Sequence, residues 1–262
     1  MDVSVENNPD IWLASFPRPR AIVNKHDRGG AVIFGAPELS GATRLSAVAC
    51  SRIGAGLVTV LADKMIDIFK ASLPADIMVR SGSLEALKTT NVLLGGPGGI
   101  SASHHSQLLE NLHGAKRVFD ASAIPEEMDW AYLDDNCVLT PHQGEFRSIF
   151  PWVDSEPCRS AVQAAKSCAG IIVLKGPLTV IAHPDGRIVL NNEPNPYLAK
   201  AGTGDVLAGF IAGLLAQGMP AFEGACAAVW IHSRAGDMLG PGLTAADLEF
   251  TIPEIYRDLE IG

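Results

Sequence analysis

Short, almost entirely apolar runs recur along this chain, and they constrain its fold more than any other feature. Each run has the length of a β-strand, and the runs lie at residues 30–34, 57–62, 77–79, 91–94, 117–119, 136–139, 171–175 and 178–182. A strand that is apolar on both faces must be covered on both faces, which favours a sheet buried between two layers of helices. Segments between and after these runs have the pattern of helices, at residues 41–53, 103–112, 206–217 and 222–239.

The alternation of strands and helices predicts an α/β fold, a three-layer α/β/α sandwich with a mostly parallel central sheet. The chain has 262 residues, of which 47% are hydrophobic, so it can bury a large core. Its proline-rich stretches are short, and no internal repeat or low-complexity linker divides it. We therefore expect a single domain over residues 1–262.

Charge and composition exclude several classes of protein. The net charge of −9 disfavours nucleic acid and anionic membranes as partners, because both attract basic surfaces. The N-terminus is acidic and has no apolar signal-peptide core, and no apolar run reaches about 18 residues, the length needed to cross a membrane. The five cysteines form no C-x-x-C pair, which is typical of reduced thiols. These features predict a soluble, cytoplasmic protein.

The segment around Gly202-Thr203-Gly204-Asp205 carries the clearest functional signal. It leads into a predicted helix of small residues. Free N–H groups and the positive end of the helix dipole make such a helix start a site for phosphate, and glycine lets the backbone approach an anion closely. A carboxylate beside this site would repel phosphate, so Asp205 is better suited to take a proton from a hydroxyl that is being phosphorylated. The segment predicts phosphoryl chemistry.

Residues directly after strands form a second group of candidates, because ligands of open α/β sheets bind beyond the carboxyl ends of the strands. The glycine-rich loop 95–99 is either a plain turn or a place where a ligand lies against bare backbone. Asp120 either caps the following helix or binds a metal ion or a substrate hydroxyl. Lys175 either stands exposed on a hairpin or reaches a nucleotide phosphate.

His142 is the most informative histidine, because it follows a strand and begins a helix together with Glu145. A structural and a functional role are both open for it. Zinc is disfavoured, since no third ligand lies nearby with suitable spacing. The remaining histidines are interpreted as surface or packing residues: His26, His104, His105, His113, His183 and His232. A dinucleotide fingerprint is also disfavoured, because no apolar strand runs directly into Gly202.

Taken in order, these motifs resemble one family, the ADP/ATP-dependent NAD(P)H-hydrate dehydratases of the ribokinase-like superfamily. The resemblance runs from about residue 24 to residue 240 and is carried by Lys25-x-x-Arg28-Gly29, Gly41-Ala42, Gly54-Ala55-Gly56-Leu57-Val58, Gly96-Pro97-Gly98, Asp120-Ala121, Thr140-Pro141-His142-x-x-Glu145-Phe146, Lys175-Gly176-x-x-Thr179 and Gly202-Thr203-Gly204-Asp205-x-Leu207-x-Gly209. Four positions depart from the family pattern: Gly99-Ile100 stands where Leu-Gly is usual, Ser122 replaces an aspartate, and Gln143 replaces a proline. The epimerase domain that is often fused in front is expected to be absent.

The resemblance implies a lyase that repairs hydrated nicotinamide nucleotides, (S)-NADHX and (S)-NADPHX. Hydroxide leaves poorly, so a phosphoryl group from ADP or ATP converts the ring hydroxyl into a phosphate, whose loss restores NADH or NADPH. Asp205 is then the catalytic base and contacts the substrate, and Mg²⁺ offsets charge on the nucleotide. The hydrate lies near Ala42, Gly98 and His142. The expected nucleotide-binding residues are Lys175, Gly176, Pro177, Leu178, Thr179, Gly202, Thr203 and Gly204. The family further implies a homo-oligomer, with a tetramer as one form.

Two alternatives stay open at this point. A small-molecule kinase of the same superfamily, acting on a hydroxymethylpyrimidine, a thiazole alcohol or a sugar, would use the same aspartate but release a stable phosphorylated product. A catalytically inactive nucleotide-binding protein is the other, and the altered glycine loop and Ser122 favour it.

Overall fold

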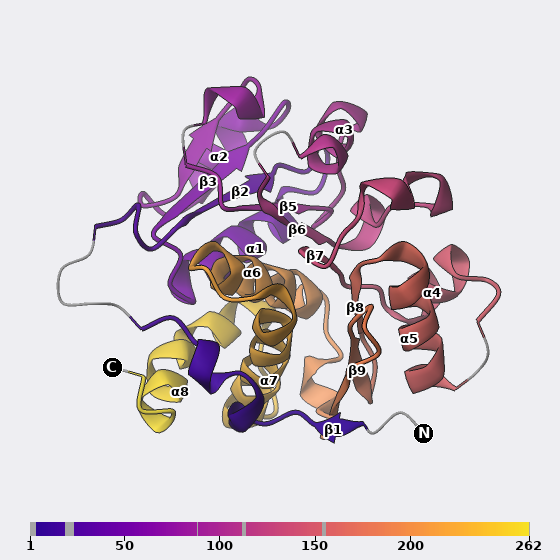
Figure 1. The fold of residues 1–262 in the computed structure, drawn as a ribbon. Coiled ribbons are helices and arrows are strands. Elements are labelled where there is room, and N and C mark those ends of the chain that lie inside the picture. Colours follow the sequence, from indigo (N-terminus) through magenta and orange to yellow (C-terminus); the bar gives the residue numbers. More distant parts are fainter. Residues whose placement is uncertain (1–3, 19–23, 88, 112–113, 154–155, 262) are drawn as a thin grey trace.

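One mixed sheet forms the middle layer of the molecule. In the computed structural model the described residues are 4–18, 24–87, 89–111, 114–153 and 156–261, and they form a ten-stranded sheet of order β1-β10-β9-β8-β7-β6-β5-β2-β3-β4 (Figure 1). Its strands are β1 (Val5–Glu6), β2 (Gly30–Phe34), β3 (Leu57–Leu61), β4 (Met78–Arg80), β5 (Val92–Gly95), β6 (Lys116–Phe119), β7 (Cys137–Leu139), β8 (Ile171–Leu174), β9 (Thr179–Ala182) and β10 (Ile188–Asn191). Neighbouring strands are parallel except at β8–β9 and β9–β10.

Helices cover both faces of this sheet. They are α1 (Ser40–Arg52), α2 (Ile66–Ser72), α3 (Ala102–Glu110), α4 (Gln143–Ile149), α5 (Pro157–Cys168), α6 (Thr203–Ala216), α7 (Ala221–Leu239) and α8 (Ile252–Asp258). Alternate strand residues separate the core in two, as Ile33 packs with α1, α6 and α7 while Phe34 packs with α3, α4 and α5. The predicted three-layer α/β/α class is therefore confirmed.

The predicted elements agree closely with the observed ones. Strand β2 has the predicted bounds, and the other predicted strands differ from the observed ones by a residue or two. Helix α6 starts at Thr203, three residues before the predicted start, because Gly202 takes a left-handed φ of 93° that ends the preceding loop. Strands β1 and β10 and helices α2, α5 and α8 were not predicted. Residue 112, at the predicted end of α3, lies outside the described residues.

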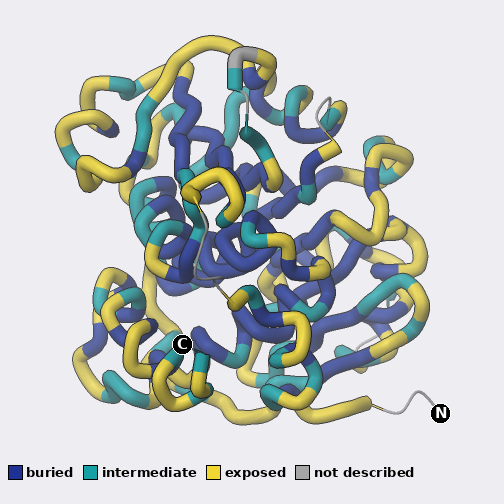
Figure 2. The backbone as a smooth tube through the Cα atoms, turned by 60° about the vertical axis from the view of Figure 1, so that its left-hand side comes forward, coloured by how far each residue is buried: buried dark blue, intermediate teal, exposed yellow. Residues whose placement is uncertain are grey.

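Helix α6 is the most deeply buried helix and carries the candidate phosphate site at its start. A Cβ atom on Gly209 would lie 2.3 Å from the backbone oxygen of Ser46, and one on Gly213 would lie 2.7 Å from that of Cys50. Both positions therefore require glycine, which brings the backbones of α6 and α1 into contact. Figure 2 shows the buried backbone in the interior and exposed backbone in the outer loops.

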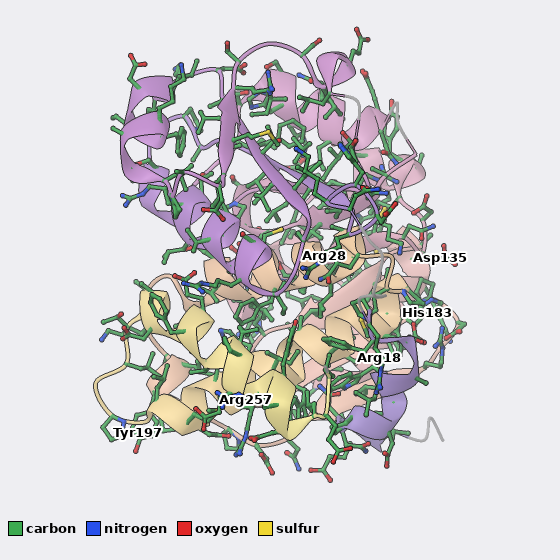
Figure 3. All side chains as sticks on the ribbon, turned by 90° about the vertical axis from the view of Figure 1, so that its left-hand side faces the viewer. Arg18, Arg28, Asp135, His183, Tyr197 and Arg257 are labelled. Carbon is green, nitrogen blue, oxygen red and sulfur yellow. The ribbon has the colours of Figure 1, made fainter. Side chains whose placement is uncertain are left out.

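Polar side chains lie mostly outside these layers. Asp135, Tyr197 and Arg257 are exposed at the periphery of the molecule (Figure 3). The cysteines are unpaired, and all but Cys158 are buried. Within the part of the chain that the structure describes, no helix combines the length and apolarity needed to cross a bilayer.

Candidate functional site

The start of α6 has the features of an anion site. Its first residue, Thr203, follows Gly202, and no side chain caps the helix. Among the described residues, the backbone N–H groups of Gly204 and Asp205 have no acceptor outside the helix. Free N–H groups in a first helical turn bind anions, and the helix dipole adds to the attraction.

Asp205 lies in this first turn with an unusual acidity. Burial raises its pKa to about 6, the negative charge of Asp120 adds to the rise, and the ammonium of Lys175 opposes it. Its backbone oxygen accepts a hydrogen bond of 2.9 Å from Ser46 Oγ, which ties the turn to α1. A carboxylate with this pKa is still largely ionised at neutral pH and is a stronger base than an exposed aspartate.

Asp120 and Lys175 meet beside this turn. Asp120 ends strand β6 and is 3% exposed; its Oδ1 accepts hydrogen bonds from Lys175 Nζ at 2.8 Å and from Thr140 Oγ1 at 2.6 Å. The capping alternative for Asp120 is wrong, since its side chain makes no cap hydrogen bond to the short helix that follows. Lys175 does lie in the connection of the β8–β9 hairpin, but its ammonium points inward, 3.4 Å from where a Cβ on Gly204 would lie.

The glycine-rich loop after β5 lies against the start of α1. A Cβ on Gly96 would overlap the backbone oxygen of Asp120 at 1.7 Å, so the loop can approach the end of β6 only with glycine there. The oxygen of Pro97 accepts a hydrogen bond of 3.1 Å from Thr43 Oγ1. A Cβ on Gly98 would lie 3.1 Å from that of Ala42, so the structure brings these two predicted hydrate-binding residues together.

A cavity of about 680 Å³, called the main cavity below, opens in front of the helix start. Predicted site residues that line it are His142, Lys175, Gly176, Pro177, Thr179, Thr203 and Gly204. Five others do not line it: Ala42, Gly98, Leu178, Gly202 and Asp205. Leu178 instead packs against the core on the α3–α5 side of the sheet. Most of the predicted nucleotide-binding residues therefore share one cavity.

His142 lines the main cavity and also caps α4. Its Nδ1 accepts hydrogen bonds from the N–H groups of Gly144 at 2.9 Å and Glu145 at 3.2 Å, while Glu145 Oε2 accepts one from the His142 N–H at 2.9 Å. This reciprocal capping box occupies Nδ1 and explains the His-x-x-Glu spacing. The predicted contact of His142 with a substrate stays a prediction.

The sequence analysis missed the wall of the main cavity that comes from residues 191–199 and from α7. The missed lining residues are Asn191, Glu193, Pro194, Asn195, Pro196, Leu198, Ala199, Leu207, Val229, His232 and Ser233. His232 had been interpreted as a surface or packing residue, yet its Nε2 lies 2.9 Å from the backbone oxygen of Thr203. The adjacent polar residues His232 and Ser233 in the mostly apolar helix α7 were the sequence feature that could have indicated this wall.

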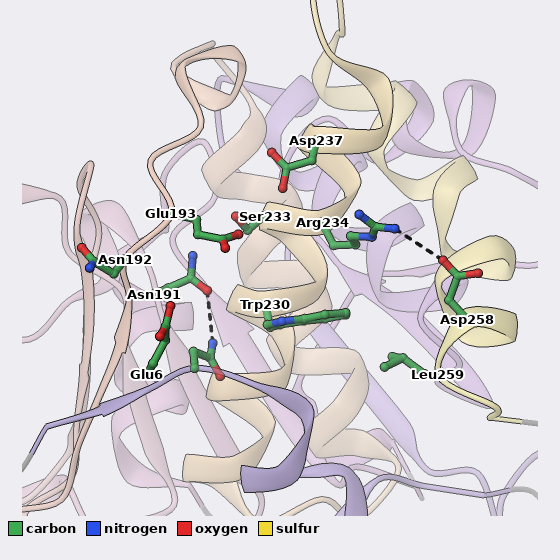
Figure 4. A pocket seen from close by; sticks show the side chains of 11 residues that line it. Glu6, Asn191, Asn192, Glu193, Trp230, Ser233, Arg234, Asp237, Asp258 and Leu259 are labelled. Atoms are coloured by element: carbon green, nitrogen blue, oxygen red, sulfur yellow. Dashed lines mark hydrogen bonds and ion pairs between the residues drawn. The ribbon is translucent and has the colours of Figure 1, made fainter.

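A second cavity of about 430 Å³, called the acidic pocket below, lies beside the main cavity. The two share Asn191, Glu193 and Ser233 as lining residues. Figure 4 shows carboxylates on several sides of the acidic pocket and the ring of Trp230 between them. Its one lining cation, Arg234, lies 3.6 Å from Asp258 in the described structure.

No cluster of three or more histidine, cysteine, aspartate or glutamate side chains suited to a metal ion occurs in the described ranges. Asp120, the carboxylate deepest in the site, already accepts hydrogen bonds from Lys175 and Thr140. The described side chains do not build a metal site of their own. A divalent cation would need oxygen ligands from a bound nucleotide.

Comparison with known proteins identifies the family. The family model described as NAD(P)H-hydrate dehydratase matches residues 31–253. The chain belongs to this family. It is 32% identical to the ADP-dependent (S)-NAD(P)H-hydrate dehydratase of Neisseria meningitidis, over 80% of this chain and 76% of that protein. The bifunctional NAD(P)H-hydrate repair enzyme Nnr of Moorella thermoacetica is 33% identical over 95% of this chain, which spans about half (53%) of that longer relative.

Solved structures share the fold of this chain. A ribokinase-like superfamily protein from Enterococcus faecalis is 28% identical with a TM-score of 0.82, over 98% of this chain and 96% of that one. The ADP/ATP-dependent NAD(P)H-hydrate dehydratase of Bacillus subtilis, co-crystallized with ATP/Mg²⁺, has a TM-score of 0.83 at 23% identity, over 98% and 99% of the two chains. The predicted ribokinase-like fold is confirmed.

Proposed function

We propose that this protein is a nucleotide-dependent NAD(P)H-hydrate dehydratase, a hydro-lyase that converts (S)-NADHX and (S)-NADPHX back to NADH and NADPH. The observation that carries the proposal is Asp205, a carboxylate with a raised pKa in the same helical turn as unpaired backbone N–H groups. This arrangement provides a base and an anion site within one turn of chain. Membership of the family supports the choice of substrate.

The reaction proceeds by phosphorylation and elimination. Asp205 takes the proton of the ring hydroxyl while the hydroxyl oxygen attacks the terminal phosphorus of ADP or ATP, and the bond from that phosphorus to the rest of the nucleotide breaks. The C–O bond of the phosphorylated ring then breaks with its electron pair going to phosphate. A neighbouring ring carbon then loses a proton to water or to the departing phosphate, and the electrons of that C–H bond restore the double bond of the dihydronicotinamide.

Backbone N–H groups and one lysine stabilise the transferred group. The N–H groups of Gly204 and Asp205, which have no acceptor outside the helix, would bind the phosphoryl oxygens, and Lys175 Nζ lies beside Gly204. Asp120 fixes that ammonium through its 2.8 Å contact. The described side chains form no metal cluster, so a Mg²⁺ ion would be held by the phosphates of the nucleotide and would offset their charge.

The two substrates occupy neighbouring parts of the site. The nucleotide lies in the main cavity along Lys175, Gly176, Pro177, Thr179, Thr203 and Gly204. Gly202 and Leu178 support these residues from outside the cavity. The hydrate lies on the other side of the turn, against Ala42 and Gly98, and His142 is placed at the boundary. The protein acts as a single domain over residues 1–262, as a cytoplasmic homo-oligomer.

The decisive experiment incubates the protein with NADH hydrate and either ADP or ATP. Recovery of absorbance at the dihydronicotinamide band, dependent on the nucleotide, is the expected result. Nucleotide consumption with a small alcohol and no recovery of the band would support the kinase instead. Binding of nucleotide without any turnover would support the inactive protein. Running ADP and ATP in parallel identifies the phosphoryl donor.

A further inference from the structure

His232 lies deep in the wall of the main cavity and is 8% exposed. It belongs to α7, and its Nε2 is 2.9 Å from the backbone oxygen of Thr203. A carbonyl oxygen can only accept a hydrogen bond, so Nε2 carries a proton. The imidazole therefore touches both the cavity and the turn at the start of α6.

The tautomer of His232 leaves a free lone pair. Burial lowers its pKa to about 4, and the positive charge of Lys175 contributes to the lowering, so the ring is neutral at physiological pH. With the proton on Nε2, Nδ1 is a hydrogen-bond acceptor. Among the described residues no donor lies within hydrogen-bond distance of Nδ1. The imidazole packs edge-on against Phe210, with 73° between the two ring planes. Nδ1 is not fully buried, so a ligand or water in the main cavity can supply the donor.

The surroundings determine which part of a ligand Nδ1 can meet. Phosphate oxygens are acceptors and would repel this lone pair, and they are attracted instead to Lys175 and the N–H groups of the turn. Toward residues 194–198 the wall is neutral and largely apolar, from Pro194, Pro196, Leu198, Leu207 and Val229. Such a wall suits the uncharged part of a nucleotide. The group that faces Nδ1 must therefore be an N–H or O–H donor of the nucleoside.

We infer that His232 selects the nucleoside of the phosphoryl donor, with its Nδ1 accepting a hydrogen bond from either the exocyclic amino group of adenine or a ribose hydroxyl. The inference rests on the proposed function, because it deepens the description of the same nucleotide site. It makes His232 a specificity-determining residue. Its Nε2 contact has a separate role, which is to hold the backbone of Thr203.

Two substitutions separate these roles. In His232→Gln the amide nitrogen can reach the position of Nε2 and keep the bond to Thr203, while the acceptor at Nδ1 is lost. In His232→Asn the amide oxygen can occupy the position of Nδ1, while the bond to Thr203 is lost. His183→Gln is the matched control, because His183 pairs with Asp185 and does not line the main cavity.

The test measures dissociation constants by calorimetry, without hydrate, for ADP, IDP, 2′-deoxy-ADP and 3′-deoxy-ADP. IDP lacks the amino group, and each deoxy analogue lacks one hydroxyl. We expect wild-type protein to bind one of the three analogues about tenfold more weakly than ADP. We expect His232→Gln to bind ADP about as weakly as the wild type binds that analogue, with no further loss for the analogue. His232→Asn keeps the discrimination, and His183→Gln behaves as wild type.

Equal binding of all four nucleotides by wild-type protein would overturn the inference. Unchanged ADP affinity in a folded His232→Gln variant would do the same, even if hydrate turnover is present. Discrimination by His232 without hydrate turnover would instead uphold the inference and reject the dehydratase reaction. If His232→Gln fails to fold, as judged by thermal unfolding, the analogue series on wild-type protein and His232→Asn decides the matter.

Discussion

The main cavity and the acidic pocket share a wall but have opposite chemistry. The main cavity combines a lysine with the unpaired N–H groups of a helix start, whereas carboxylates of Glu6, Asp237 and Asp258 face the acidic pocket. The main cavity lies beyond the carboxyl ends of the central strands, and the acidic pocket lies where β1 and β10 meet α7 and α8. An anion entering this region therefore has one favourable destination.

This contrast explains how a protein of net charge −9 can bind a nucleotide. The attraction comes from backbone dipoles and one partly buried ammonium rather than from a basic surface, so it does not depend on the overall charge. The carboxylates of the acidic pocket repel phosphate, so a nucleotide binds in the main cavity instead. The following experiments test this difference, from the largest expected effect to the smallest.

Replacing Asp205 with asparagine is expected to have the largest effect. It removes the base but keeps the size of the side chain, so turnover of NADH hydrate should fall by about 10³-fold, while calorimetry shows nucleotide binding within a fewfold of wild type. Asp258→Asn, in the acidic pocket, should leave turnover unchanged. Near-full activity of the Asp205 variant would remove that residue from the mechanism.

Lys175→Met should destabilise the fold, because it leaves Asp120 buried without its cation. The expected loss is about 2–3 kcal/mol of unfolding free energy by urea denaturation. In the acidic pocket Arg234→Met leaves a half-exposed Asp258 and should cost less than about 0.5 kcal/mol. Adding Asp120→Asn to Lys175→Met should recover most of the loss. Equal losses of unfolding free energy for Lys175→Met and Arg234→Met would mean that burial does not make the Lys175–Asp120 pair more important for stability than the Arg234–Asp258 pair.

Acidification should reduce turnover earlier than an ordinary aspartate would predict. Asp205 acts as a base only when ionised, and its pKa in the ligand-free protein is raised to about 6, so kcat/KM should fall as the pH drops through 6. At pH 5 the rate should be about tenfold below its plateau. Circular dichroism over the same range checks that the protein stays folded. A profile that stays flat down to pH 4.5 would contradict the assignment.

The smallest effect is expected at the shared wall. Glu193→Gln removes a negative charge that faces both cavities, so ADP should bind about twofold more tightly at low ionic strength. The gain should disappear in concentrated salt, because the charge is screened. Glu6→Gln, which lines the acidic pocket alone, serves as the control. Tighter binding of ADP by Glu6→Gln would show that charges in the acidic pocket also affect binding in the main cavity.

The sequence was sufficient for the elements that local pattern determines. The apolar runs predicted the sheet, and Gly202-Thr203-Gly204-Asp205 predicted a helix start with phosphate chemistry, because glycine and helix-start geometry act within a few residues. The bounds of β2 and the hairpin after Lys175 follow from equally local signals. Strand β1 has two residues, too few to produce a pattern, whereas β10 was missed although it is as long as the predicted β9.

The local sequence pattern could not predict contacts between segments that are far apart in the chain. His232 bonds to a backbone oxygen 29 residues away, and no property of its own helix indicates this. Asp120 and Lys175 are 55 residues apart, so the sequence could place each at a strand end without pairing them. The wall at residues 191–199 was missed because a loop that contributes mainly apolar and amide groups has no distinctive signature. Such features depend on the packing of the whole sheet.

The contact between the α1 and α6 backbones determines how the site responds to change elsewhere. Side chains can adopt new rotamers when neighbours are altered, but two backbones in contact at Gly209 and Gly213 have no such freedom. Ala42 on α1 and Asp205 on α6 are therefore carried by one rigid frame. In the proposed reaction, this frame fixes the distance between the hydroxyl of the hydrate and the carboxylate of Asp205, even when loop residues change. An alanine at Gly209 would force the helices apart and lengthen that span, impairing catalysis from a position that touches no substrate.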